Sequence, residues 1–155
     1  MNKFSEIYST LFYIGYSKYA PGTIGSFISL IIIYFLKNNF NYIFFLIFFI
    51  ILLLLSFFLI KIFSNEIDEY DASEIIIDEF LGVYFIMLFW DFFTYFNEFV
   101  NLFMVFILFR LFDISKFFPA NYIQNNFKNS FGVIFDDIIA GIYTVIVIIL
   151  INVVI

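Results

Sequence analysis

The sequence contains no cysteine and no histidine. The first absence excludes disulfide bonds and thiolate nucleophiles, and the second excludes imidazole bases, phosphohistidine intermediates and histidine metal ligands. Charge is also scarce, since charged residues make up 13% of the 155 residues, against about a quarter in an average soluble domain. The formal net charge of −6 does not favour nucleic-acid binding. Any chemistry must therefore use carboxylates, hydroxyls, Lys, Arg, Tyr or a bound metal.

What the sequence has in abundance is apolar residues, which reach 65%. A soluble fold of this size has too little interior to bury them, so a membrane protein is expected. Backbone groups in lipid must be hydrogen-bonded within the segment, which favours helices, and the alternating pattern of a β-barrel strand is absent. The sequence predicts a single all-α domain over residues 1–155, a polytopic transmembrane helix bundle in which four to five of about five apolar segments span. These segments cover residues 24–36, 42–63, 75–90, 99–112 and 133–155.

The first apolar segment is shorter than the roughly 20 residues that a span needs, so the sequence leaves open whether it crosses fully. No cleavage-site pattern precedes it, and we expect no removable signal peptide. With the N-terminus in the cytoplasm, six of the seven basic residues fall on the cytoplasmic side, as the positive-inside rule predicts; Lys37 is the exception. The same topology brings four polar motifs to the cytoplasmic face. The acidic segment 64–74 is interpreted as a solvated connector.

Two acidic pairs, Asp78-Glu79 and Asp136-Asp137, open apolar segments. One acid is enough to complement the positive end of a helix dipole, and two adjacent acids repel each other unless a cation lies between them. Oxygen ligands of this kind suit Mg²⁺. A divalent metal site is therefore favoured over helix capping. Gly82 and Gly141 each follow an acid by four residues, a spacing that lets another helix approach closely.

The two remaining motifs are basic and glycine-rich. Arg110 and Asp113 share a helix face because they are three residues apart, and Lys116 extends the positive edge; the alternative is an interfacial ion pair with a snorkelling Arg. The motif of residues 21–26, Pro-Gly-Thr-Ile-Gly-Ser, is either a simple helix start or an anion site made from amides and hydroxyls. It lacks the spacing of a Walker loop.

Together these motifs resemble the phosphatidylglycerophosphatase A family in order and spacing. The resemblance runs from about Gly15 to Tyr143 and rests on residues 20–26, 77–82, 109–116 and 132–141. It implies a Mg²⁺-dependent lipid phosphatase of the bacterial inner membrane, with its site toward the cytoplasm, that converts phosphatidylglycerophosphate to phosphatidylglycerol and phosphate. The chain departs from the family pattern at Phe117, where Pro is usual, at Asn121, where a basic residue is common, and at Phe131, where a Gly precedes Gly132.

On this basis we hypothesise two groups of site residues. The acids are expected to share one or two Mg²⁺ and to carry catalysis: Asp78, Glu79, Asp113, Asp136 and Asp137. The phosphate is expected to be held by Gly22, Thr23, Gly25, Ser26, Arg110 and Lys116. The sequence does not assign the base, the number of metal ions, a covalent aspartyl phosphate or an oligomeric state. Three alternatives stay open, namely an ion transporter or channel, a structural protein whose charges only join helices, and a phosphatase of another phosphorylated lipid.

Overall fold

The computed structural model describes residues 2–154. Within this range the chain forms seven α-helices and two short 3₁₀ helices, and it contains no strand. In chain order they are α1 (Lys3–Ser9), η1 (Ile14–Tyr16), α2 (Pro21–Asn39), α3 (Tyr42–Ile67), α4 (Ile77–Met87), η2 (Trp90–Phe92), α5 (Glu98–Ser115), α6 (Ala120–Asn126) and α7 (Ser130–Val154). The predicted all-α class is confirmed.

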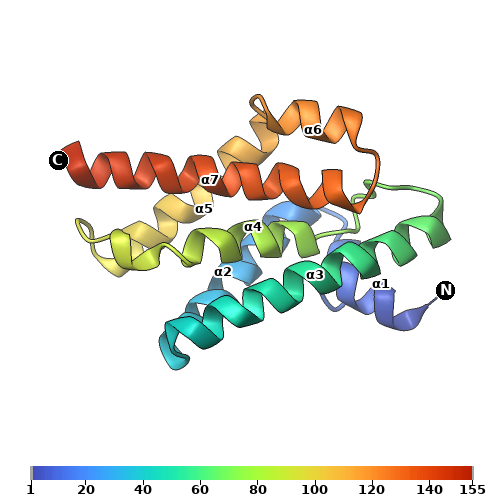
Figure 1. Ribbon diagram of the computed structural model, residues 1–155, viewed down its shortest axis with the longest axis horizontal. Helices are drawn as coiled ribbons and strands as arrows, with labels where there is room; N and C mark the ends of the chain where they lie inside the picture. The colour runs from blue at the N-terminus through green and yellow to red at the C-terminus, as the bar shows by residue number, and fades with distance from the viewer. Residues whose placement is uncertain (1, 155) are drawn as a thin grey trace.

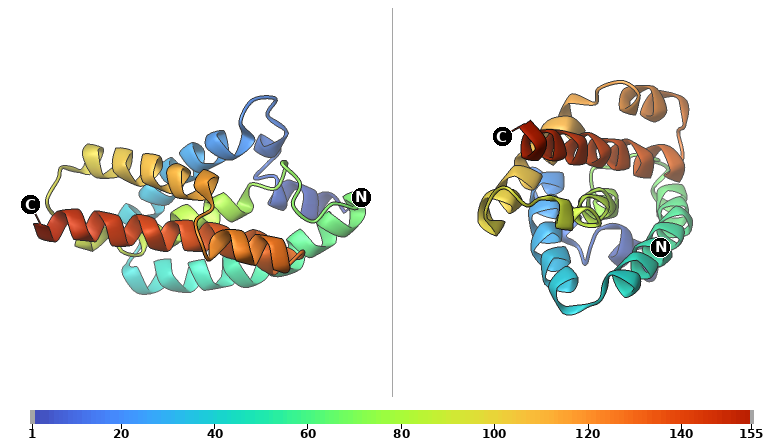
Figure 2. Two further views of the ribbon diagram at one scale, coloured as in Figure 1. Left: turned by 90° about the horizontal axis from the view of Figure 1, so that it is seen from above. Right: turned by 60° about the vertical axis from the view of Figure 1, so that its left-hand side comes forward.

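Helix α4 lies at the centre of the bundle. The end-on view in Figure 2 shows it enclosed by α2, α3, α5 and α7, and it packs most extensively against α7 and α2. Its side chains are buried on every side, including Leu81, Val83, Tyr84 and Ile86. A helix that is apolar all round is one that other helices surround, so the apolar run in this part of the sequence reflects burial in protein.

The surrounding helices turn large apolar side chains outward. Phe35 on α2, Phe58 on α3, Phe103 on α5 and Leu150 on α7 are all more than half exposed. Soluble monomers rarely expose apolar surface on this scale. A bundle with apolar residues on both its inside and its outside is expected for a protein surrounded by lipid.

Three helices, α2, α3 and α7, are long and apolar enough to span a membrane, so the prediction of four to five spans was too high. Helix α4 has 11 residues, which gives it a length of about 16 Å, and the chain then turns into η2. Helix α5 carries three charged residues, Glu98, Arg110 and Asp113. The first segment proved longer than predicted because Pro21 occupies the first helical turn, a position that proline favours.

The helices alternate in direction along the long axis of the molecule. Helices α2, α4 and α7 begin in the half that holds the N-terminus, and α3 and α5 run toward that half (Figure 1). The short helices α1 and α6 lie there too; they were not predicted because neither has an apolar run of spanning length. This alternation brings the starts of three helices and the end of α5 together, as the predicted topology required.

Candidate functional site

A cavity of about 430 Å³ opens where the starts of α2, α4 and α7 meet the end of α5. Its wall contains every carboxylate and both cationic side chains of the predicted site, together with two of the four residues expected from the glycine-rich motif. These are Asp78, Glu79, Asp113, Asp136, Asp137, Arg110, Lys116, Gly22 and Thr23. Residues up to 115 positions apart in the sequence therefore share one cavity.

Three of the acids converge. Asp78 and Glu79 lie in the first turn of α4, Asp137 lies in α7, and each offers one carboxylate oxygen within 4.8 Å of the others. Asp78 Oδ1 and Glu79 Oε2 are buried and have no hydrogen-bond partner among the described residues. Burying an unpartnered carboxylate oxygen is costly, and hard divalent cations take oxygen ligands in this arrangement. The donor set therefore fits a Mg²⁺ ion.

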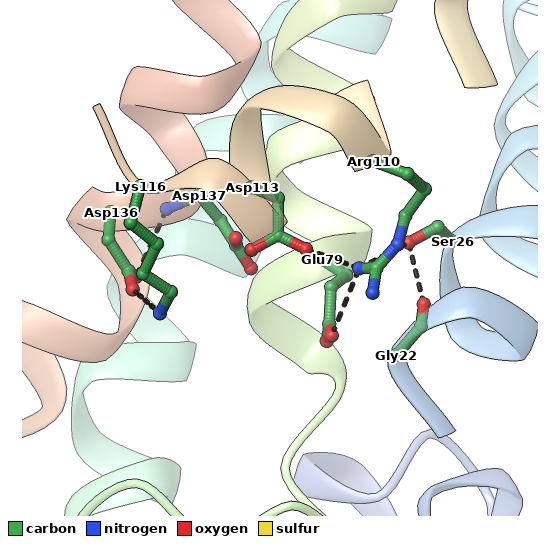
Figure 3. A network of polar contacts seen from close by, with 8 residues as sticks. All are labelled: Gly22, Ser26, Glu79, Arg110, Asp113, Lys116, Asp136 and Asp137. Atoms are coloured by element: carbon green, nitrogen blue, oxygen red, sulfur yellow. Dashed lines mark hydrogen bonds and ion pairs between the residues drawn. The ribbon is translucent and has the colours of Figure 1, made fainter. Parts of the chain in front are cut away.

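The other two acids are paired with the two cations (Figure 3). Arg110 forms an ion pair with Asp113, and its Nη1 lies 3.6 Å from Glu79 Oε1. Lys116 Nζ donates a hydrogen bond of 2.6 Å to Asp136 Oδ2. Two cations against five carboxylates leave three negative charges uncompensated if all of the acids ionise. Such a charge excess in a partly buried site is unfavourable without a further cation.

Lys116 reaches the site because it ends α5 in a left-handed conformation, with φ of 43°. Its N–H donates to the carbonyl oxygen of Phe112 at 3.0 Å, which closes the last turn in the manner of a left-handed helix cap. Burial lowers the pKa of the Lys116 ammonium, but the neighbouring Asp136 and Asp137 carboxylates raise it, and the net pKa lies above its ordinary value. Lys116 therefore stays charged beside the carboxylates.

The start of α2 supports Arg110 through a serine. Ser26 Oγ donates to the carbonyl oxygen of Gly22 at 2.7 Å, and Arg110 Nη1 donates to Ser26 Oγ at 3.4 Å. Ser26 is fully buried and lies behind the cavity wall. The N–H groups of Thr23 and Ile24 donate to the carbonyl oxygen of Ala20. These two amides are already engaged, so the Thr23 hydroxyl is the better donor toward the cavity.

Gly25 differs from its neighbours in the motif. It is not part of the cavity wall, and a Cβ added to it would lie 3.1 Å from the Ile76 side chain. Its role in this structure is to let α2 pack against the residue that precedes α4. Gly22 faces the site instead, because a Cβ there would lie 2.1 Å from Glu79 Oε1.

The two glycines that follow the acidic pairs lie where α4 crosses α7. A Cβ on Gly82 would lie 2.9 Å from the carbonyl oxygen of Asp137 and 2.7 Å from the Phe109 ring. A Cβ on Gly141 would lie 3.0 Å from the carbonyl oxygen of Gly82. This close crossing brings Asp78 and Asp137 within reach of one ion.

The sequence analysis missed two residues of the cavity wall, Asp71 and Ser73. They belong to the acidic segment that was interpreted as a solvated connector. Asp71 is exposed, and its Oδ2 accepts a hydrogen bond of 2.7 Å from Gln124 Nε2 of α6. No local signal separates Asp71 from its acidic neighbours Asp68 and Glu69, because its place in the wall depends on how the loop folds back.

Comparisons with known proteins agree with the motifs. The model of the family phosphatidylglycerophosphatase A matches residues 7–152. Phosphatidylglycerophosphatase A of Haemophilus influenzae is 34% identical over 134 residues, which cover 83% of this chain and 77% of the relative. A protein of Bacteroides thetaiotaomicron named "Putative phosphatidylinositol-3-phosphatase" is 31% identical over 155 residues, with 86% of this chain and 84% of the relative covered. No solved structure matches. With a family match over nearly its whole length, the chain belongs to the phosphatidylglycerophosphatase A family.

Proposed function

We propose that this membrane phosphatase hydrolyses the terminal phosphomonoester of phosphatidylglycerophosphate to phosphatidylglycerol and phosphate, with Mg²⁺ as cofactor. The observation that carries the proposal is the cavity that collects five carboxylates and two cations in a chain of this family. The product named follows the name of the Haemophilus influenzae relative.

A lipid substrate suits the position of the cavity. The cavity opens beside helices whose outer faces are apolar, so a lipid can stay in the bilayer while its headgroup enters. Basic residues also gather in this half of the molecule, while Lys37 pairs with Asp91 in the other half at 2.5 Å. The positive-inside rule then favours a cytoplasmic site in the bacterial inner membrane.

Asp78, Glu79 and Asp137 are the residues best arranged to hold Mg²⁺. The bound ion would shield the charge of the phosphate and lower the pKa of a bound water. Asp113 and Asp136, also expected as ligands, hold Arg110 and Lys116 in place. A carboxylate of the cluster accepts the proton of the attacking water.

Arg110 and Lys116 provide the positive charge that the phosphoryl oxygens need. Arg110 is fixed by Glu79, Asp113 and Ser26, so little reorganisation is required when negative charge develops in the transition state. Lys116 contributes a second cation across the cavity, and the Thr23 hydroxyl adds a neutral donor. Positioning and electrostatic stabilisation of this kind account for most catalysis in phosphoryl transfer.

A second candidate substrate is another phosphorylated lipid, such as a phosphatidylinositol phosphate. The name of the Bacteroides thetaiotaomicron relative favours it, and the charged groups of the cavity recognise a phosphoryl group rather than a particular alcohol. The transporter hypothesis requires ion flux through liposomes without phosphate release, and a purely structural role requires that Asp136→Asn be tolerated.

The test is phosphate release by the purified protein in detergent, with and without Mg²⁺. We expect Mg²⁺-dependent release from phosphatidylglycerophosphate, and slower release from phosphatidylinositol 3-phosphate. Asp91→Asn is the matched control, because Asp91 is an exposed acid in the other half of the molecule. Release from phosphatidylinositol 3-phosphate alone would replace the proposed substrate, and release from neither lipid would reject a lipid phosphatase.

A further inference from the structure

A second hollow, almost entirely apolar, lies between α2 and α5 on the outer face of the bundle. It has a volume of about 290 Å³. Phe27 and Ile31 of α2 and Phe103 and Phe106 of α5 contribute to its wall, and the first three are more than half exposed. The rings of Phe27 and Phe106 meet edge to face, with centroids 5.7 Å apart. This groove is therefore open to the surrounding lipid.

The groove continues the polar cavity along the same two helices. Thr23 lines the cavity and Phe27, four residues later, lines the groove; on α5 the corresponding pair is Arg110 and Phe106. Residues four apart lie on one face of a helix. The Ser26–Arg110 hydrogen bond joins the helices where groove and cavity meet. One continuous surface thus passes from phosphate-binding groups to aromatic rings.

The far end of the groove is closed by polar contacts. The Tyr34 hydroxyl donates to the Glu98 carboxylate, and the Tyr34 ring meets the Trp90 ring at a centroid distance of 5.7 Å. From Thr23 to Tyr34 the helix rises by about 16 Å at 1.5 Å per residue. The groove is an apolar channel with a charged entrance and a polar stop.

We infer that this groove seats one acyl chain of the lipid whose phosphomonoester enters the cavity. The inference rests on the proposed function and adds a second binding site for the same substrate. Its entrance beside Arg110 and its apolar wall match a molecule with an anionic head and a hydrocarbon tail.

The groove acts by orienting the lipid. An acyl chain gains little by leaving the bilayer for the groove, because lipid tails are as apolar as the helix side chains. Fixing the chain does limit how the headgroup enters the cavity, and such positioning controls the rate of the reaction step. The groove should therefore affect kcat/KM for substrates with long chains and have little effect on those with short chains.

The kinetic test fills the groove with Ile31→Trp and uses Ile107→Trp as its control. Ile107 is a similarly exposed residue of α5 that does not line the groove. Ile31 lies eight residues, about 12 Å, beyond Thr23, further than a hexanoyl chain reaches. Each variant is assayed with dipalmitoyl and dihexanoyl phosphatidylglycerophosphate in detergent micelles.

We expect Ile31→Trp to lower kcat/KM for the dipalmitoyl substrate about tenfold and to leave the dihexanoyl substrate unchanged, while Ile107→Trp matches wild type with both. Equal losses with both substrates, or no loss with either, would overturn the inference. Absence of hydrolysis by the wild-type protein would count against the proposed function instead.

Photocrosslinking tests the groove without relying on activity or on a tryptophan variant. A phosphatidylglycerophosphate analogue with a diazirine in one acyl chain is bound to the wild-type protein, and the labelled peptides are mapped. We expect label on groove residues such as Ile31 and Phe103, displaced by unlabelled phosphatidylglycerophosphate and not by phosphatidylcholine. Label that is spread over the outer faces of α3 and α7, or that phosphatidylcholine displaces equally, would show ordinary bilayer lipid and refute the inference.

Discussion

The substitution Gly82→Ala tests whether the close crossing of α4 and α7 builds the acid cluster. The added Cβ would lie 2.7 Å from the Phe109 ring and 2.9 Å from the carbonyl oxygen of Asp137. The ring is completely buried, and the carbonyl belongs to the backbone of α7, so neither obstacle moves freely. Relief to an ordinary contact needs roughly 0.5 Å of separation between the helices, and that movement draws Asp137 away from Asp78.

We expect a loss of activity that exceeds the loss of stability. Overpacking costs about 1–3 kcal/mol, but Ala is about 1 kcal/mol better than Gly within a helix, so the free energy of unfolding should fall by about 0–2 kcal/mol. A misplacement of about 1 Å can cost on the order of 10² in rate, and half of that should lower kcat about 10-fold or more.

The assay compares phosphate release with thermal unfolding in the same detergent. Val83→Ala is the matched control, because Val83 is the next residue of α4 and is equally buried. Deleting its methyl groups should cost about 1–3 kcal/mol without separating the helices, so its activity per folded molecule should stay normal. Full activity in Gly82→Ala, or an equal loss of activity in Val83→Ala, would refute the role given to this crossing.

Four further outcomes are expected. Asp78→Asn and Asp137→Asn should each lower Mg²⁺-dependent phosphate release on the order of 10², measured at equal amounts of folded protein; near-normal release by either would remove that residue from the centre. Chelation should abolish release and Mg²⁺ should restore it, so full activity in excess chelator would reject the metal. Lys116→Met should raise KM about tenfold and Lys116→Arg should restore part of it, since the loss of one charged contact costs about 1.5–3 kcal/mol; an unchanged KM would mean that Lys116 only holds Asp136. Asp91→Asn should leave kcat unchanged and lower stability by about 1 kcal/mol or less, because its pair with Lys37 is exposed and distant; reduced kcat would show that the far half of the molecule contributes to the site.

The members of the site could be found from the sequence because charge is rare in it. In a chain this apolar, ionisable groups tend to be kept only where they pair, bind an ion or take part in chemistry. The alternation of apolar segments then placed Asp78, Asp113 and Asp137 at one level, and all three line the same cavity. This step needed only local patterns and a rule for topology.

The sequence could not divide the acids by role. Asp136 and Asp137 are neighbours, yet Asp136 pairs with Lys116 while Asp137 joins Asp78 and Glu79. Successive residues on a helix point about 100° apart, so the orientation of α7 decides which acid faces α4. That orientation depends on packing at Gly82 and Gly141.

By itself, the sequence determined that the protein is helical, that its surface is apolar, and which polar motifs it carries, because these follow from composition and short-range spacing. Only the tertiary structure decided that α4 is a buried central helix rather than a lipid-facing span, that Gly25 serves packing, and that an apolar groove adjoins the cavity. An apolar run has the same composition whether protein or lipid surrounds it, and the contacts made by neighbouring helices settle which of the two it meets.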